Sequence, residues 1–103
     1  MELDEPNVIR IGDMELDMER GRLSKGKRSH HLGPKKLKLM MIFGQYPNRV
    51  LSEERLRLVP YGDEWREEAA VRANIRGCRQ VLRHLQSKAR INVIVHYGWE
   101  FVP

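Results

Sequence analysis

The sequence predicts an α+β fold in which a small antiparallel strand meander, three helices and a C-terminal β-hairpin follow one another along the chain. Apolar and polar residues alternate in the first third, apolar residues recur at helical spacing in the middle, and two strand-like runs flank a turn at the end. A chain of 103 residues has room for a single modest core, so we expect residues 1–103 to form one domain.

The strand meander is expected at about residues 8–31. Its strands are Val8–Ile11, Met14–Asp17, Arg22–Ser24 and Arg28–His31, with a glycine in each of the three connections. In the second strand apolar residues alternate with acids, which is typical of a strand with one buried face. The glycines favour tight turns, and the pattern therefore predicts an antiparallel sheet.

Two helices are expected next, at about residues 34–46 and 52–59. Pro34 suits the first helical position, and an apolar stripe follows it at helical spacing. The second helix begins at Ser52, a residue type that caps helices, and two glutamates occupy the first turn, where the helix dipole favours acids. Pro60 ends this helix.

The third helix, at about residues 67–85, carries an apolar stripe and an arginine stripe with the same i, i+4, i+7, i+11 spacing. The apolar stripe consists of Val71, Ile75, Cys78 and Leu82, and the arginine stripe of Arg72, Arg76, Arg79 and Arg83. Burial of the apolar stripe directs the arginines along one edge of the helix. No acid occurs between Ala69 and Ile94, so these arginines repel one another, and phosphate groups would relieve that repulsion. A solvated face is the alternative, but such faces usually mix both charge signs.

The charge of the whole chain supports a polyanionic partner. The formal net charge is +5 and the isoelectric point is about 9.7, which favours nucleic acid, an anionic membrane surface or an acidic protein. Acids dominate residues 1–19, whereas none occurs from Arg20 to Ser52. The longest apolar run, Leu39–Phe43, is too short to span a bilayer, and the acidic start is unlike a signal peptide, so a cytoplasmic location is expected.

Enzymatic chemistry, a metal site and a cofactor are not expected. His30 and His31 are adjacent and point to opposite faces of a strand, and no cysteine or acid stands at ligand spacing from them. His84 and His96 are isolated in the sequence. Cys78 is the only cysteine, and its place on the apolar stripe predicts a buried, small hydrophobic side chain.

The chain closes with a hairpin at about residues 91–102. Ile91–Val95 and Trp99–Val102 read as strands, and Gly98 is expected to permit the tight turn between them. Three helices, the last of them basic, followed by a hairpin are the outline of a winged helix-turn-helix. In that arrangement the last helix is the candidate for the major groove of DNA, and the hairpin, or wing, for an adjacent contact.

Five short segments resemble those of one known family. Leu32-Gly33-Pro34 is similar to its Leu-Thr-Pro helix entry, and residues 47–56 resemble its Pro-Gly-Arg-Val-Val-Ser-Arg-Glu-Gln-Leu segment. Tyr61-Gly62 resembles its Trp-Gly pair, residues 70–82 its recognition helix, and residues 98–101 its closing Gly-Tyr-Arg-Phe. In this order and spacing they resemble the C-terminal effector domain of the OmpR/PhoB-type response regulators of bacterial two-component systems, over nearly the whole chain.

The resemblance implies sequence-specific binding of duplex DNA and regulation of transcription, here without a receiver domain. The implied DNA-binding residues are Arg72, Ala73, Asn74, Arg76, Arg79, Arg83, His96 and Tyr97. An arginine at position 76 is suited to guanine O6 and N7, with a phosphate contact as the alternative. The other three arginines of the stripe are suited to phosphates. Ala73 suits a thymine methyl group, and Asn74 suits adenine or a phosphate.

The residues of the expected wing turn are candidates for contact with DNA. His96 and Tyr97 are expected to meet the neighbouring DNA backbone or minor groove, and the alternative for Tyr97 is packing under the hairpin. Trp99 and Phe101 are assigned to the core. Dimerisation on DNA is left open, and the start at Met1 with its acids favours a stand-alone effector over a fragment of a larger regulator.

Departures from the family pattern support a rival hypothesis. Ala69 replaces an arginine that often contacts phosphate, and Gly77 stands where some members carry a base-reading arginine. These departures indicate that the domain prefers a different DNA sequence. The alternative is that the chain is a protein-interaction module that binds RNA polymerase or another regulator. The loop at residues 60–65 is the candidate partner surface, through Tyr61, Asp63, Glu64 and Trp65.

Overall fold

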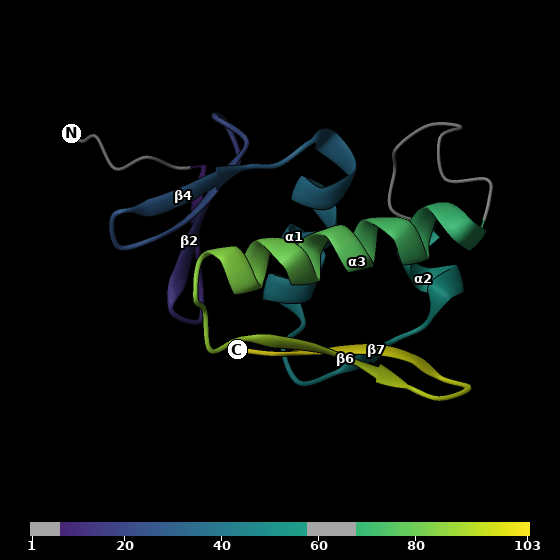
Figure 1. Ribbon diagram of the computed structural model, residues 1–103. Helices are drawn as coiled ribbons and strands as arrows, with labels where there is room; N and C mark the ends of the chain where they lie inside the picture. The colour runs from purple at the N-terminus through teal and green to yellow at the C-terminus, as the bar shows by residue number, and fades with distance from the viewer. Residues whose placement is uncertain (1–6, 58–67) are drawn as a thin grey trace.

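The computed structural model describes residues 7–57 and 68–103 (Figure 1). The expected order of elements is confirmed, with one added strand: β1 (Val8–Ile11), β2 (Met14–Asp17), β3 (Arg22–Lys25), β4 (Arg28–His31), α1 (Pro34–Gln45), β5 (Val50–Leu51), α2 (Glu53–Arg57), α3 (Glu68–His84), β6 (Arg90–Ile94) and β7 (Gly98–Val102). Residues 58 and 59, expected to end the second helix, and the loop at residues 60–65 lie outside the described residues.

The four N-terminal strands form an antiparallel sheet in the order β1-β2-β3-β4. Met14 and Leu16 of β2 and Leu23 of β3 are fully buried, so the alternation in the sequence corresponds to one buried sheet face. Leu16 and Leu23 stand directly opposite each other in the register. Side chains at this spacing pack against each other across the strands and fix the register.

The second sheet, called the wing sheet below, has the strand order β5-β7-β6, and β5 was not predicted. Val50 pairs with Glu100 and Leu51 with Trp99. The N–H of Asn48 also donates to the carbonyl of Phe101 at 2.8 Å. A strand of two residues is too short to show alternation, which is why the sequence pattern missed it. Through β5, the segment that leads into α2 is held against the wing.

Gly98, expected to permit the wing turn, lies directly after that turn and has a φ of 143°, which residues other than glycine rarely adopt. The turn comprises residues 95–97, and the residue in the left-handed region is His96, with φ 72°. The N–H of Tyr97 closes the turn by donating to the carbonyl of Ile94 at 2.9 Å. Gly98 begins β7 instead, and a Cβ on it would overlap the carbonyl oxygen of Leu51. Glycine is needed there for the close approach of β7 to β5.

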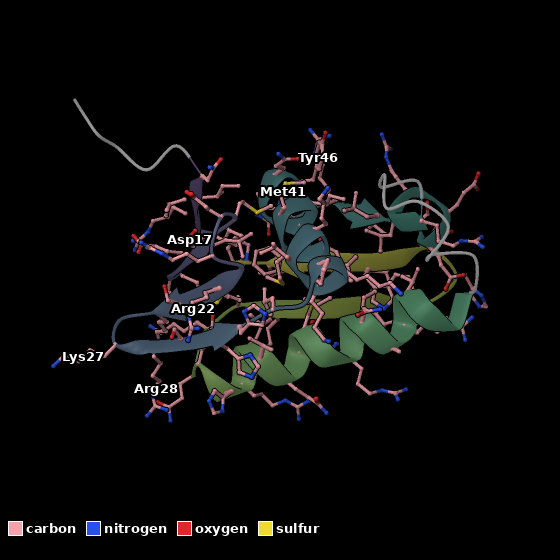
Figure 2. The ribbon with its side chains drawn as sticks, turned by 90° about the horizontal axis from the view of Figure 1, so that it is seen from above. Asp17, Arg22, Lys27, Arg28, Met41 and Tyr46 are labelled. Carbon is pink, nitrogen blue, oxygen red and sulfur yellow. The ribbon has the colours of Figure 1, made fainter. Side chains whose placement is uncertain are left out.

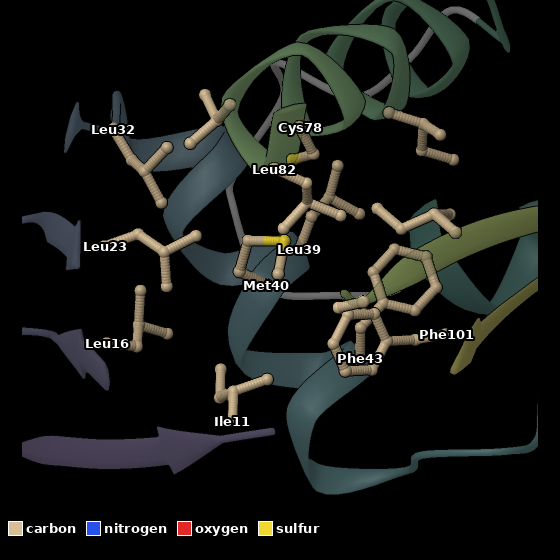
Figure 3. Packing of buried hydrophobic residues seen from close by; sticks show 14 of the residues in the cluster. Ile11, Leu16, Leu23, Leu32, Leu39, Met40, Phe43, Cys78, Leu82 and Phe101 are labelled. Carbon is tan, nitrogen blue, oxygen red and sulfur yellow. The ribbon is translucent and has the colours of Figure 1, made fainter. Parts of the chain in front are cut away.

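Helix α1 lies at the centre of the core, between the N-terminal sheet, α3 and the wing sheet (Figure 3). The rings of Phe43 and Phe101 are 6.2 Å apart, which joins α1 to β7. Trp99, Phe101 and Cys78 are buried as expected. Burial raises the pKa of the Cys78 thiol to about 12. The buried residues labelled in Figure 3 belong to this core: Ile11, Leu16, Leu23, Leu32, Leu39, Met40, Phe43, Cys78, Leu82 and Phe101.

Asp13, in the turn between β1 and β2, holds the connection between α3 and β6. Its carboxylate accepts a hydrogen bond from the Ser87 hydroxyl at 2.6 Å and one from the Lys88 N–H at 3.0 Å. The ammonium group of Lys25 lies 3.6 Å away. Burial alone would raise the pKa of Asp13, but these hydrogen bonds and the lysine charge together hold it below 3.8.

A carboxyl group with a lowered pKa in the folded state stabilises the fold above its unfolded pKa, and this contribution is lost as the pH falls through the folded value. We therefore expect Asp13→Asn to lower the free energy of unfolding at neutral pH by about 1–2 kcal/mol. The difference from the unchanged protein should shrink in strong acid. Urea unfolding at both pH values checks this, with the exposed Glu15→Gln as control. Equal losses at both pH values would contradict the role given to the Asp13 charge.

Candidate nucleic-acid interface

Helix α3 lies at an edge of the molecule, and side chains extend from it away from α1 (Figure 2). Its apolar stripe faces inward: Val71, Ile75 and Cys78 are at most 1% exposed and Leu82 is 4% exposed. Val81 and Leu85 are also buried and widen the apolar side. The predicted geometry of the two stripes is therefore confirmed, because burial of the apolar residues leaves the arginine side at the surface.

Arg76 and Arg83 are exposed cations on this side of α3. Neither guanidinium group makes a hydrogen bond or ion pair with another described residue. Gln80, one turn after Arg76, is exposed between them. An unpaired guanidinium group on a rigid helix keeps all its N–H donors available for an anion.

Arg72 differs from the expectation of uncompensated arginines. Its Nε lies 3.3 Å from Oε1 of Glu53, in the first turn of α2, and its side chain is 60% exposed. The prediction failed because it considered acids only between Ala69 and Ile94 along the chain, and Glu53 comes from another element. The ion pair holds the Arg72 side chain toward α2 and lowers the net charge at this end of the arginine stripe.

Arg79 is half-buried and connects α3 to the wing. Its Nε–H donates to the carbonyl of Ile91, in β6, at 2.8 Å. Arg79 also lines a pocket of about 310 Å³ between α3 and β6, together with Arg83 and Arg90. The other lining residues are Leu82, Ser87, Ala89 and Ile91, so no acidic side chain of the described residues lines it. Three guanidinium groups around one hollow suit a phosphate group.

Arg90 was not among the expected site residues. It lies outside the periodic helical segment, so helical spacing gave no signal for it. The pairing of β6 with β7 and the turn after α3 bring it beside Arg79 and Arg83. Only the basic run from Arg72 to Arg90 in the sequence pointed toward it.

The wing tip places its two expected site residues at the surface. Tyr97 is 72% exposed, so it does not pack under the hairpin, and His96 is also exposed. Both line a groove of about 460 Å³ whose other walls include Arg72 of α3 and Glu53 of α2. The structure thus brings the N-terminal half of α3 and the wing tip to one groove.

The remaining expected residues divide into two groups. Ala73 is exposed on α3, and Asn74 is half-buried. The candidate partner loop, with Tyr61, Asp63, Glu64 and Trp65, lies outside the described residues.

Two histidines that are distant in sequence lie together on the other flank of α3. The rings of His30, in β4, and His84 are 5.3 Å apart and meet edge to face. Sequence spacing gave no sign of this contact, which depends on how β4 packs on α3. Within residues 7–57 and 68–103 no group of three or more His, Cys, Asp or Glu is placed to hold a metal ion. No helix in the same two ranges is long and apolar enough to cross a bilayer.

Comparisons with known proteins give a match in structure only. No protein-family model matches the sequence, and a comparison with curated proteins finds no match. The DNA-binding domain of E. coli CadC superposes with a TM-score of 0.84 at 21% identity, over 97% of this chain and 96% of that one.

Two response regulators give similar superpositions. The DNA-binding domain of AdeR, solved in complex with an intercistronic region, has a TM-score of 0.79 at 14% identity, over 91% of this chain and 98% of that one. DrrB, an OmpR/PhoB homologue from Thermotoga maritima, has a TM-score of 0.75 at 18% identity, over 94% of this chain and 45% of that one. The chain therefore has the winged helix-turn-helix fold of OmpR/PhoB-type effector domains.

Proposed function

We propose that this protein binds duplex DNA sequence-specifically and regulates transcription, with α3 in the major groove and the wing at the adjacent backbone or minor groove. The observation that carries the proposal is the exposed side of α3, where Arg76 and Arg83 have no partner among the described residues. The fold shared with the AdeR DNA-binding domain, which was solved in complex with an intercistronic region, supports DNA as the partner.

The four arginines of the stripe divide by their surroundings. Arg76 is the candidate for reading guanine, since its guanidinium group is exposed and unpaired on the middle of the helix. Arg79 and Arg83 are candidates for phosphate contacts, because with Arg90 they surround the hollow between α3 and β6. Arg72, held by Glu53 beside the wing-tip groove, suits a phosphate near Tyr97.

Affinity for duplex DNA should fall steeply with salt. Each phosphate contact that releases a counterion contributes about −0.9 to the slope of log K against log salt, so about five contacts give a slope near −4 to −5. Titration of unrelated duplexes at several salt concentrations, followed by fluorescence anisotropy, measures this slope. A flat dependence, or no binding at low salt, would exclude DNA as the partner of the arginine side of α3.

Two finer hypotheses accompany this proposal. Contact with RNA polymerase or another regulator through Tyr61, Asp63, Glu64 and Trp65 would let the domain act on transcription once bound. If that contact were the main function, duplex affinity would be weak at every salt concentration while the partner bound tightly. A dimer on DNA is the second hypothesis, and a selected binding site with two half-sites would support it.

A further inference from the structure

Gly77 occupies an unfavourable place for a glycine, in the middle of the 17-residue helix α3. Glycine weakens helices at interior positions, so a glycine there usually means that another group approaches the helix closely. The space is occupied by Lys36 of α1. A Cβ on residue 77 would overlap Cε of Lys36 and would lie 3.3 Å from its Cδ and 3.4 Å from its Nζ. The lysine side chain therefore crosses the surface of α3 directly over Gly77.

The ammonium group of Lys36 is available to a ligand. Lys36 is half-buried, and within the described part of the chain Nζ makes no hydrogen bond or ion pair. Its backbone carbonyl faces the Cys78 thiol, with Sγ 3.9 Å from the oxygen, so the first turn of α1 is packed against α3. The lysine is thus carried on a fixed backbone while its charge lies at the surface of the neighbouring helix.

A pocket of about 330 Å³ surrounds this lysine. Its lining consists of His30, His31, Lys36, Gly77, Gln80, Val81 and His84, so no acidic side chain of the described residues neutralises it. Gln80 is exposed one turn after Arg76. The pocket therefore adjoins the arginine side of α3 on the flank away from the wing.

The width of the DNA groove connects these observations. A helix with its side chains is about 10–12 Å across, and the major groove is about 12 Å wide. The two phosphate backbones that border the groove therefore approach both flanks of an inserted helix. On the wing flank lie Arg79 and Arg83 of α3 and Arg90 of β6. On the opposite flank the residues of α3 that line the pocket are Gly77, Gln80, Val81 and His84, and the lysine there is Lys36 of α1.

We propose that Lys36 is a phosphate contact of the DNA complex, delivered from α1 across α3, and that residue 77 is glycine in order to admit it. This inference rests on the proposed function, since the phosphate belongs to duplex DNA. It also accounts for a recognition helix that has no cation of its own at position 77.

The first test is Lys36→Met, which keeps the length of the side chain and removes its charge. The log–log salt slope should become shallower by about 0.9, which is an affinity loss of about eightfold at 0.1 M salt, and the loss should be equal on random and on selected duplexes. Lys27→Met is the matched control, because Lys27 is exposed at the β3–β4 turn and projects away from α3 (Figure 2). A Lys36→Met protein that matches this control would overturn the proposal, as would a loss confined to the selected site.

The second test links Lys36 to Gly77. Gly77→Ala should displace the lysine and weaken duplex binding, while its melting temperature stays equal or rises, because alanine favours the helix. In a Lys36→Met background the same substitution should cause no further loss. Equal losses in both backgrounds would show that Gly77 acts without Lys36 and would contradict the proposal.

The unchanged protein separates this inference from the proposed function. If it fails to bind duplex DNA at low salt, the proposed function is wrong. If it binds with a steep salt dependence and Lys36→Met has no effect, only the role of Lys36 is wrong.

Discussion

Trp99→Ala should lower the free energy of unfolding by about 3–5 kcal/mol, the range for truncating a large buried aromatic side chain. Trp99 is only 9% exposed, and in the middle strand of the wing sheet it stands opposite Leu51 of β5 and Val93 of β6. Its loss would leave a void beside the buried Leu51. Urea or thermal unfolding measures the change.

Tyr97→Ala is the control for this prediction, since it removes an aromatic ring from the same hairpin. Tyr97 is 72% exposed, so its truncation should change stability little and should weaken duplex binding instead. If Tyr97→Ala were the more destabilising of the two substitutions, Tyr97 would belong to the core and not to the DNA-binding surface.

Arg76→Ala should weaken binding to the preferred site by about 1–3 kcal/mol more than binding to random duplexes. The reason is that a bidentate contact to guanine is lost only where guanine is present. Arg76 is exposed and makes no hydrogen bond or ion pair with another described residue, so its removal should leave the melting temperature nearly unchanged. The preferred site would first be selected from random duplexes and then compared with them by anisotropy.

Arg79→Ala and Arg83→Ala should weaken all duplexes about equally, as phosphate contacts do. Arg83 is the closer match to Arg76, because it is exposed and unpaired within the described chain. Arg79→Ala also removes the hydrogen bond to Ile91, so part of its loss should come from a displaced wing. If Arg76→Ala and Arg83→Ala gave the same loss on every duplex, Arg76 would be a phosphate contact and base reading would have no assigned residue.

The sequence predicted those parts of the fold that depend on local periodicity. The two stripes of α3 and the strands of the meander follow from spacing alone, and Ser52 caps α2 as expected, since its hydroxyl accepts the Arg55 N–H at 3.0 Å. The need for glycine at position 98 was also predicted, and its φ of 143° beside the turn agrees with that prediction. A second reason was not predicted: β7 approaches Leu51 closely at Gly98, and Leu51 is a residue far away in sequence that no hairpin rule includes.

The parts of the candidate site that the sequence missed depend on contacts between elements. The pairing of Arg72 with Glu53, the bond from Arg79 to Ile91 and the passage of Lys36 over Gly77 each join residues on different elements. Nothing in the spacing along α3 indicates them. In the sequence, Gly77 is a departure from the family pattern. The packing of α1 on α3 supplies a physical reason for a glycine at this position.

If the domain binds DNA as proposed, the hydrogen bond from Arg79 to Ile91 affects which target it chooses. The bond joins a donor on α3 to an acceptor on β6 and so restrains the angle between the helix and the hairpin. Helix α3 and the wing would therefore meet DNA as one unit, with a fixed distance between them. Targets whose groove width does not fit that distance have to bend or change their twist, and the energy of that deformation differs between sequences. In this way a single bond inside the protein lets base pairs that no side chain touches contribute to the choice of site.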